Sequence, residues 1–78
     1  MAFIGPTIER NISTAAGKTF KIFLTEQEGG YWVATVLYAR EGTVSTKNLI
    51  GGSKEEAYES AVAWCKESID KDATVEPL

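Results

Sequence analysis

The chain lacks histidine altogether and contains only one cysteine among its 78 residues. Without histidine it cannot form a histidine-based catalytic triad, a histidine general base or a histidine metal ligand. One cysteine cannot build a multi-cysteine zinc site or an internal disulfide, which favours a reducing, intracellular environment, and we expect a cytoplasmic protein. No phosphate-binding loop or dinucleotide fingerprint occurs either. We therefore expect no enzymatic activity, no cofactor and no metal.

Long hydrophobic segments and basic clusters are also missing. The longest uncharged, largely apolar run covers residues 31–39, and its nine residues are too few to cross a bilayer. The N-terminus has no basic segment followed by an apolar stretch, so we expect neither a signal peptide nor membrane association. The net charge is −3. Without clustered lysines or arginines, we do not expect binding to duplex nucleic acid.

What the sequence does contain is the composition of one ordinary globular domain, which we assign to residues 1–78. Its C-terminal third predicts a helix over residues 53–70. Ser53 is a favourable N-cap, and Glu56 three residues later completes a capping box. Apolar side chains then recur with helical spacing at Ala57, Tyr58, Ala61, Val62, Trp64, Cys65 and Ile69. Because Cys65 lies on this stripe, we expect a buried structural thiol and not a nucleophile.

Residues 7–50 have the pattern of an antiparallel sheet. Stretches 7–13, 18–25, 31–38 and 43–50 are rich in alternating apolar, β-branched and aromatic residues, and glycine turns at 28–30 and 41–42 separate the last three. Short turns between successive strands favour antiparallel pairing. We therefore predict an α+β fold, in which an antiparallel three- to four-stranded β-meander carries one C-terminal helix on one face. Residues 1–6 are expected to form a flexible arm, and residues 71–78 a tail.

The strand predicted over residues 31–38 is apolar on both faces, although one helix can cover only one of them. The other face is then solvated, or covered by a second copy or a different protein, so a homodimer is one expectation. The sheet-face interface is assigned to four aromatic residues, Phe23, Tyr31, Trp32 and Tyr38. Packing in the core or in a dimer is the simpler explanation for them. With Lys21, Arg40 and Lys47 nearby, stacking on single-stranded nucleic-acid bases is the alternative.

The helix and tail carry an excess of acids. Residues 53–78 contain seven acids against three lysines, whereas the rest of the chain is close to neutral. Helical geometry directs Glu55, Glu59, Glu67 and Asp70 away from the apolar stripe, so we expect these side chains to be exposed. They form either a solvated face that keeps the protein in solution or a docking surface for a basic protein partner.

Two motifs stand out in the sequence. One is Gly29-Gly30-Tyr31-Trp32-Val33-Ala34, a glycine turn before an aromatic strand, and the other is Gly52-Ser53-Lys54-Glu55-Glu56-Ala57, followed by Ala61. Together they resemble the motifs of the HicB-like antitoxin domain. The resemblance covers about residues 20–70 and implies a βββα domain that binds a protein partner. The family's Pro-x-x-x-Gly stretch is absent from residues 38–50, and only eight residues follow Asp70, where the family often adds a DNA-binding segment. The resemblance therefore implies the partner-binding domain alone.

These features predict a small acidic, non-enzymatic binding module that inhibits or sequesters a protein partner, as antitoxins and phage-encoded inhibitors of nucleases or nucleic-acid-binding complexes do. The alternative is a single-stranded nucleic-acid-binding protein that uses the aromatic sheet face. The predicted ββββα order also looks like that of the Whirly and PUR single-strand binders, which is a likeness of topology alone. A third hypothesis is a structural subunit with no ligand of its own.

Overall fold

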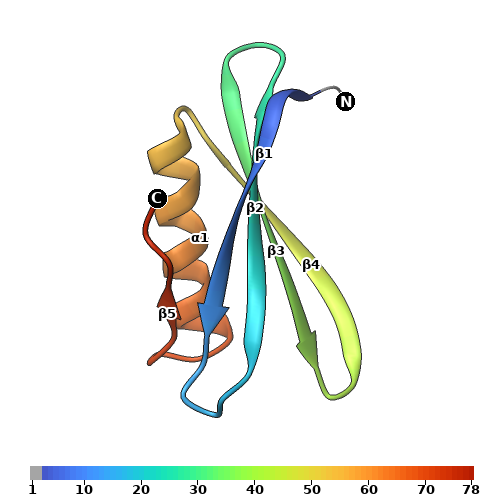
Figure 1. Ribbon diagram of the computed structural model, residues 1–78, viewed down its shortest axis with the longest axis vertical. Coiled ribbons are helices and arrows are strands. Elements are labelled where there is room, and N and C mark those ends of the chain that lie inside the picture. Colours follow the sequence, from blue (N-terminus) through green and yellow to red (C-terminus); the bar gives the residue numbers. More distant parts are fainter. Residues whose placement is uncertain (1–2) are drawn as a thin grey trace.

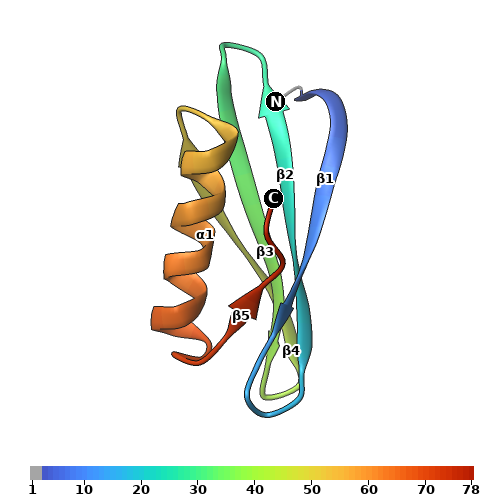
Figure 2. The same cartoon turned by 60° about the vertical axis from the view of Figure 1, so that its left-hand side comes forward.

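In the computed structural model, which describes residues 3–78, an antiparallel sheet carries a helix across one of its faces (Figures 1 and 2). The elements are β1 Phe3–Ser13, β2 Thr19–Gln27, β3 Tyr31–Arg40, β4 Thr43–Gly51, α1 Lys54–Ser68 and β5 Thr74–Val75. Their order across the sheet is β4-β3-β2-β1-β5. The predicted α+β fold, a β-meander followed by a helix on one face, is confirmed.

The register of the sheet is set by tight turns between its long strands. Arg40 pairs with Thr43, so β3 and β4 are joined by the two residues Glu41 and Gly42. Both have positive φ, 52° and 80°, which is the conformation of the hairpin turn that matches the twist of the flanking strands. Glycine adopts this conformation without steric cost, whereas Glu41 is tolerated there only because the flanking strands hold it. The pairing of β4 with β3 is then continuous from Thr43 to Gly51.

The start of α1 agrees with the capping pattern, and its end comes earlier than predicted. The Ser53 side chain accepts a hydrogen bond from the Glu56 backbone N–H at 3.1 Å, as expected of an N-cap. The helix ends at Ser68 with Ile69 as its C-cap, two residues before the predicted boundary at Asp70. Within residues 3–78, no helix is long and apolar enough to cross a membrane.

The core lies between α1 and the face of the sheet that the helix covers. Fully buried side chains of the sheet include Ile22, Leu24 and Val36, and the helix contributes Ala57, Ala61 and Cys65. These helix residues are small, so the helix axis can come close to the sheet and exclude water from the aliphatic side chains below it. Partly buried aromatic residues close the rim of the core, among them Tyr38, whose ring centroid lies 5.2 Å from that of Trp64.

Two segments near the ends of the chain, residues 3–6 and 74–75, form strands that the sequence did not indicate. Residues 3–6, predicted to be part of a flexible arm, belong to β1, which pairs with β2 from Phe3 onwards despite a register shift between Ile4 and Ile8. Residues 1 and 2 lie outside the described residues. The predicted tail adds β5, which pairs with Ile12 and Ser13 and makes the sheet one strand wider than the largest number predicted. The reason is tertiary pairing with β1, which a tail of eight residues does not reveal in its own pattern.

Candidate functional site

The outer face of α1 presents the acids that the sequence singled out. Glu55, Glu59 and Glu67 are exposed, and the helix as a whole contains four glutamates against two lysines. Among the described side chains, the one ion pair joins Lys21 to Glu9 on the sheet, so none of the helix carboxylates is neutralised by a salt bridge. The electrostatic potential of this face is therefore negative and available to a partner.

Asp70, the fourth predicted member of this face, has a different role from the glutamates. One carboxylate oxygen accepts a hydrogen bond from the Ala15 backbone N–H at 2.8 Å, and the other accepts from the Asp72 N–H at 2.9 Å. These bonds, to Asp72 first and then to Ala15, lower the pKa of the Asp70 carboxyl. Asp70 thus ties the turn after α1 to the loop between β1 and β2, and its oxygens are engaged within the fold.

A groove of about 530 Å³ lies between α1 and the segment that contains β5. Its lining consists of Tyr58, Glu59, Val62, Ala63, Lys66, Ala73, Thr74 and Val75. Most of these side chains are apolar or small, and Glu59 belongs both to the groove and to the acidic face. The lining also carries the positive charge of Lys66, so the groove places apolar surface beside charges of both signs, a combination that suits an amphipathic binding segment.

The C-terminal wall of this groove is held in place by hydrogen bonds to Glu76. The Tyr58 hydroxyl donates to the Glu76 carbonyl oxygen at 2.7 Å, so the helix holds the tail directly. The Asn11 N–H donates to the Glu76 carboxylate at 2.7 Å, and the Glu76 N–H donates to the Asn11 carbonyl at 3.0 Å. Burial raises the pKa of Tyr58, against the opposing effect of Arg10, so the phenol stays protonated and able to donate.

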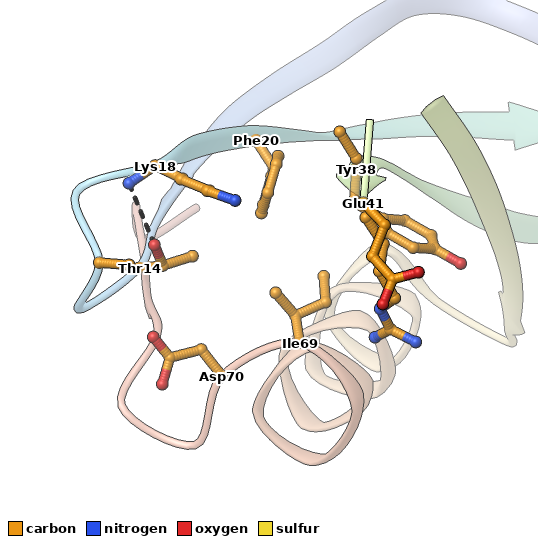
Figure 3. A pocket seen from close by; sticks show the side chains of 10 residues that line it. Thr14, Lys18, Phe20, Tyr38, Glu41, Ile69 and Asp70 are labelled. Carbon is orange, nitrogen blue, oxygen red and sulfur yellow. Dashed lines mark hydrogen bonds between the residues drawn. The ribbon is translucent and has the colours of Figure 1, made fainter. Parts of the chain in front are cut away.

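A second cavity, of about 320 Å³, lies at the C-terminal end of α1, between Ile69 and Asp70, the loop between β1 and β2, and the end of β3 (Figure 3). Phe20 extends into it from the sheet and Ile69 from the end of α1, and Tyr38 lies at its side (Figure 3). Arg40, also in its lining, donates to the Ser68 carbonyl oxygen, with its guanidinium 5.8 Å from the centre of the Tyr38 ring. A cation at this position satisfies a free carbonyl and complements the negative end of the helix dipole. Arg40 therefore serves the packing of the helix end.

The four aromatic residues assigned to one sheet face do not share a face, and this assignment needs correction. Phe23 and Tyr31 lie on the face that α1 leaves open, whereas Trp32 and Tyr38 lie on the helix side and pack against the core. The physical reason is the two-residue period of a strand, which directs Tyr31 and Trp32 to opposite faces. The open face also gains no free cation from Lys21, because that side chain pairs with Glu9.

Cys65 is fully buried on the helix side facing the sheet, as expected of a structural thiol. Burial raises the pKa of this thiol to about 11, so the reactive thiolate is scarce at neutral pH. Within residues 3–78, no group of three or more cysteine, aspartate or glutamate side chains is placed to hold a metal ion.

Sequence reasoning missed the two most exposed large apolar side chains among the described residues, which lie on β4. Val44 is 69% exposed and Ile50 is 68% exposed. Both lie on the open face, because Val44 pairs with Ala39 and Ile50 pairs with Val33. The signal was present in the alternation of the strand. Without the strand order, however, nothing indicated that β4 is an edge.

Comparison with known proteins finds no family model that matches the chain, no similar curated protein and no similar solved structure. The resemblance to the HicB-like antitoxin domain therefore stays a prediction.

Proposed function

We propose that this chain is a non-enzymatic binding module that inhibits or sequesters a protein partner with a basic surface. The observation that carries the proposal is the outer face of α1, where Glu55, Glu59 and Glu67 are exposed and free of salt bridges. Glu55 lies in the first turn, where its charge favours the helix dipole, but like charges four residues apart weaken a helix slightly, so folding gains nothing from adding Glu59 on the same side. A basic partner would gain from that placement.

The groove beside the helix supports the same proposal through different chemistry. Exposed carboxylates mainly accelerate association and select the partner, whereas buried apolar contacts supply most of the lasting affinity. Val62 and Ala63 on the helix and Val75 on β5 provide apolar surface next to Glu59. A basic amphipathic segment can place its apolar side chains in the groove and its cationic side chains over the helix carboxylates.

An acidic face of this kind suits targets whose natural ligand is a polyanion. A nuclease or another nucleic-acid-binding protein presents lysines and arginines spaced to contact phosphates. Carboxylates on a rigid helix compete for those cations without any chemical step. This is why we favour an inhibitor or antitoxin-like role over a structural one.

A charge-reversal series tests the acidic face. The partner is first captured from native lysate with the wild-type chain and identified by mass spectrometry. Its affinity is then measured for the wild type, for Glu59→Lys and for the control Glu28→Lys, which makes the same change at an exposed acid in the β2–β3 turn. We expect Glu59→Lys to weaken binding by about tenfold and Glu28→Lys to have little effect. Equal affinities for the two variants would contradict the proposal.

Two variants that each add a bulky side chain to α1 test the groove without reversing the charge of an acid. Ala63→Arg places a long side chain in the groove, whereas Ser60→Arg adds the same side chain at another exposed helix position outside it. We expect only Ala63→Arg to block binding. If both variants bind like the wild type, the groove does not take part.

Binding of single-stranded nucleic acid remains the alternative function. On the open face of the sheet, the predicted aromatic residues that could stack on bases are Phe23 and Tyr31. Fluorescence anisotropy with a labelled single-stranded oligonucleotide at physiological salt distinguishes it. Sub-micromolar affinity that is lost on Phe23→Ala would favour the alternative over the protein-binding role. Trp32 is unsuitable for this test because it packs on the helix side of the sheet.

A further inference from the structure

The two edges of the sheet are treated differently. At the β1 edge, β5 pairs with Ile12 and Ser13, and the tail continues along β1 with hydrogen bonds between Asn11 and Glu76 (Figure 2). Further up β1, Pro6 lies within the shift of register between Ile4 and Ile8 and interrupts regular pairing. Cover, proline and irregularity are the ways in which proteins protect an edge from other strands.

The β4 edge has almost none of this protection. It is nine residues long, its register with β3 has no shift, and it contains no proline. It is the outermost strand on its side of the sheet, and in Figure 1 the part of β4 toward its hairpin with β3 has neither the helix nor the tail beside it, whereas its last residues run toward α1. A long regular edge with unpaired backbone groups is a template for one more strand.

The side chains of β4 indicate which strand fits. Val44 and Ile50, the two most exposed large apolar residues of the described chain, lie on the same face, three residues to either side of Lys47. An antiparallel copy of β4 centred on Lys47 therefore brings Val44 of each copy opposite Ile50 of the other. Between them, Thr46 meets Asn48, a pair of small polar side chains without charge. On the open face the strand is self-complementary in this register, whereas on the helix side Ser45 meets Leu49.

We propose that a second copy of this chain pairs with the first through β4. The two β4 strands run antiparallel and are related by a twofold axis that passes between the two Lys47 residues. The axis is perpendicular to the sheet, so the two sheets join into one continuous sheet and both α1 helices lie on the same side of it. This inference rests on the β4 edge and not on the acidic face of α1. In consequence the dimer presents two acidic helices to one side, as a bivalent surface.

Lys47 limits the strength of this pairing. At the axis the two Lys47 side chains lie directly opposite each other, and like charges in that position oppose pairing. Lys47 is exposed, so its ammonium group can turn into water, but part of the repulsion remains. Replacing Lys47 with glutamine is therefore expected to strengthen the dimer by about threefold. The difference between the wild type and Lys47→Gln should shrink as salt is raised.

Sedimentation equilibrium from micromolar to submillimolar concentration measures the association. Val44→Thr removes an apolar partner from two symmetry-related pairs at once, so we expect it to weaken the dimer by about tenfold, and Ile50→Thr likewise. The matched control is Leu78→Thr, which alters an exposed apolar residue of the tail. A strictly monomeric wild type, or equal weakening by all three changes, would overturn the proposal.

Cysteine cross-linking tests the register. Lys47→Cys places each new thiol opposite its own copy and is expected to give a disulfide-linked dimer on mild oxidation. In the same register Thr43→Cys lies opposite Gly51, and the two new thiols are roughly 26 Å apart along the strand. This variant should therefore run as a monomer on non-reducing denaturing electrophoresis. Native Cys65 does not interfere because it is buried. Cross-linking through Thr43→Cys, or no cross-linking by Lys47→Cys in a dimeric protein, would contradict pairing through β4. In the second case, loss of the dimer on Phe23→Ser would identify the open sheet face as the interface instead.

Discussion

Replacing Gly51 with alanine is expected to destabilise the fold strongly, because Gly51 lies directly beneath the first turn of α1. It ends β4 and is buried against the helix. A Cβ atom at this position would lie 2.4 Å from the backbone nitrogen of Ala57, 2.9 Å from its Cα and 2.9 Å from the carbonyl carbon of Glu56. All three are backbone atoms, so a rotamer change cannot relieve the overlap and the helix itself must move.

The size of the effect follows from the nature of the overlap. Extra methyl groups in a packed core usually cost about 1–3 kcal/mol. Here the helix must shift away from the sheet over Ala57 and Ala61, both fully buried, so we expect the upper end, about 3 kcal/mol. A domain of this length has a free energy of unfolding on the order of 4–12 kcal/mol. The substitution therefore removes a large share of the total stability.

Gly52 provides a matched control one residue away. A Cβ atom there would lie 3.0 Å from Glu56 Oε1, the far end of a flexible side chain that can turn aside. We expect Gly52→Ala to cost less than about 1 kcal/mol. Urea unfolding followed by tryptophan fluorescence gives both free energies. If Gly51→Ala is as stable as the wild type, or if Gly52→Ala is the more harmful change, the close packing of α1 on the end of β4 is refuted.

Three further outcomes are expected. Because its backbone hydrogen bonds lower the pKa of Asp70, the ionised form stabilises the fold above the unfolded pKa, and this contribution is lost as pH falls through the folded pKa. Asp70→Ala should thus lower the melting temperature near pH 7 more than at about pH 2, and an equal loss at both would contradict this role. The Cys65 thiol, with its pKa of about 11, should stay unreactive toward a thiol reagent at neutral pH until urea unfolds the chain, so rapid labelling of the folded protein would argue against its burial. Tyr58→Phe should cost about 1 kcal/mol and accelerate hydrogen exchange in β5, because it removes the bond to the Glu76 carbonyl, and unchanged exchange there would show that the tail is held by other contacts.

The parts of the fold that were predictable from sequence are those with local signals. The capping box at Ser53 marked the start of α1 to the residue, and the glycine turn at 41–42 marked the hairpin between β3 and β4. Both signals determine the conformation of residues only a few positions away in the sequence. The end of α1 carried no such signal, because Ile69 continues the apolar stripe although the chain turns at Asp70.

The parts that were missed depend on pairing between distant residues. The tail becomes β5 because Glu76 meets Asn11, 65 residues away along the chain, and β1 extends to Phe3 because it pairs with Gln27. Neither segment has a strong strand pattern of its own.

The candidate site was predictable only where its features depend on residues close together in the sequence. Exposure of the helix glutamates follows from helical periodicity alone. The engagement of Asp70 depends on a loop far away in sequence, and the exposure of Val44 and Ile50 follows from the place of β4 at the edge of the sheet. The grouping of the aromatics failed because neighbouring strand residues point to opposite faces.

Docking of the acidic face of α1 on a basic partner is tested by the rate of association at several ionic strengths. The captured partner is measured by stopped flow or surface plasmon resonance against the wild type and the double variant Glu59→Lys, Glu67→Lys, with equal melting temperatures checked first. The proposal predicts that the double variant associates at least about tenfold more slowly at low salt, with a weaker dependence on salt. An unchanged association rate and an unchanged salt dependence would mean that the acidic face is only solvated and that the partner binds elsewhere.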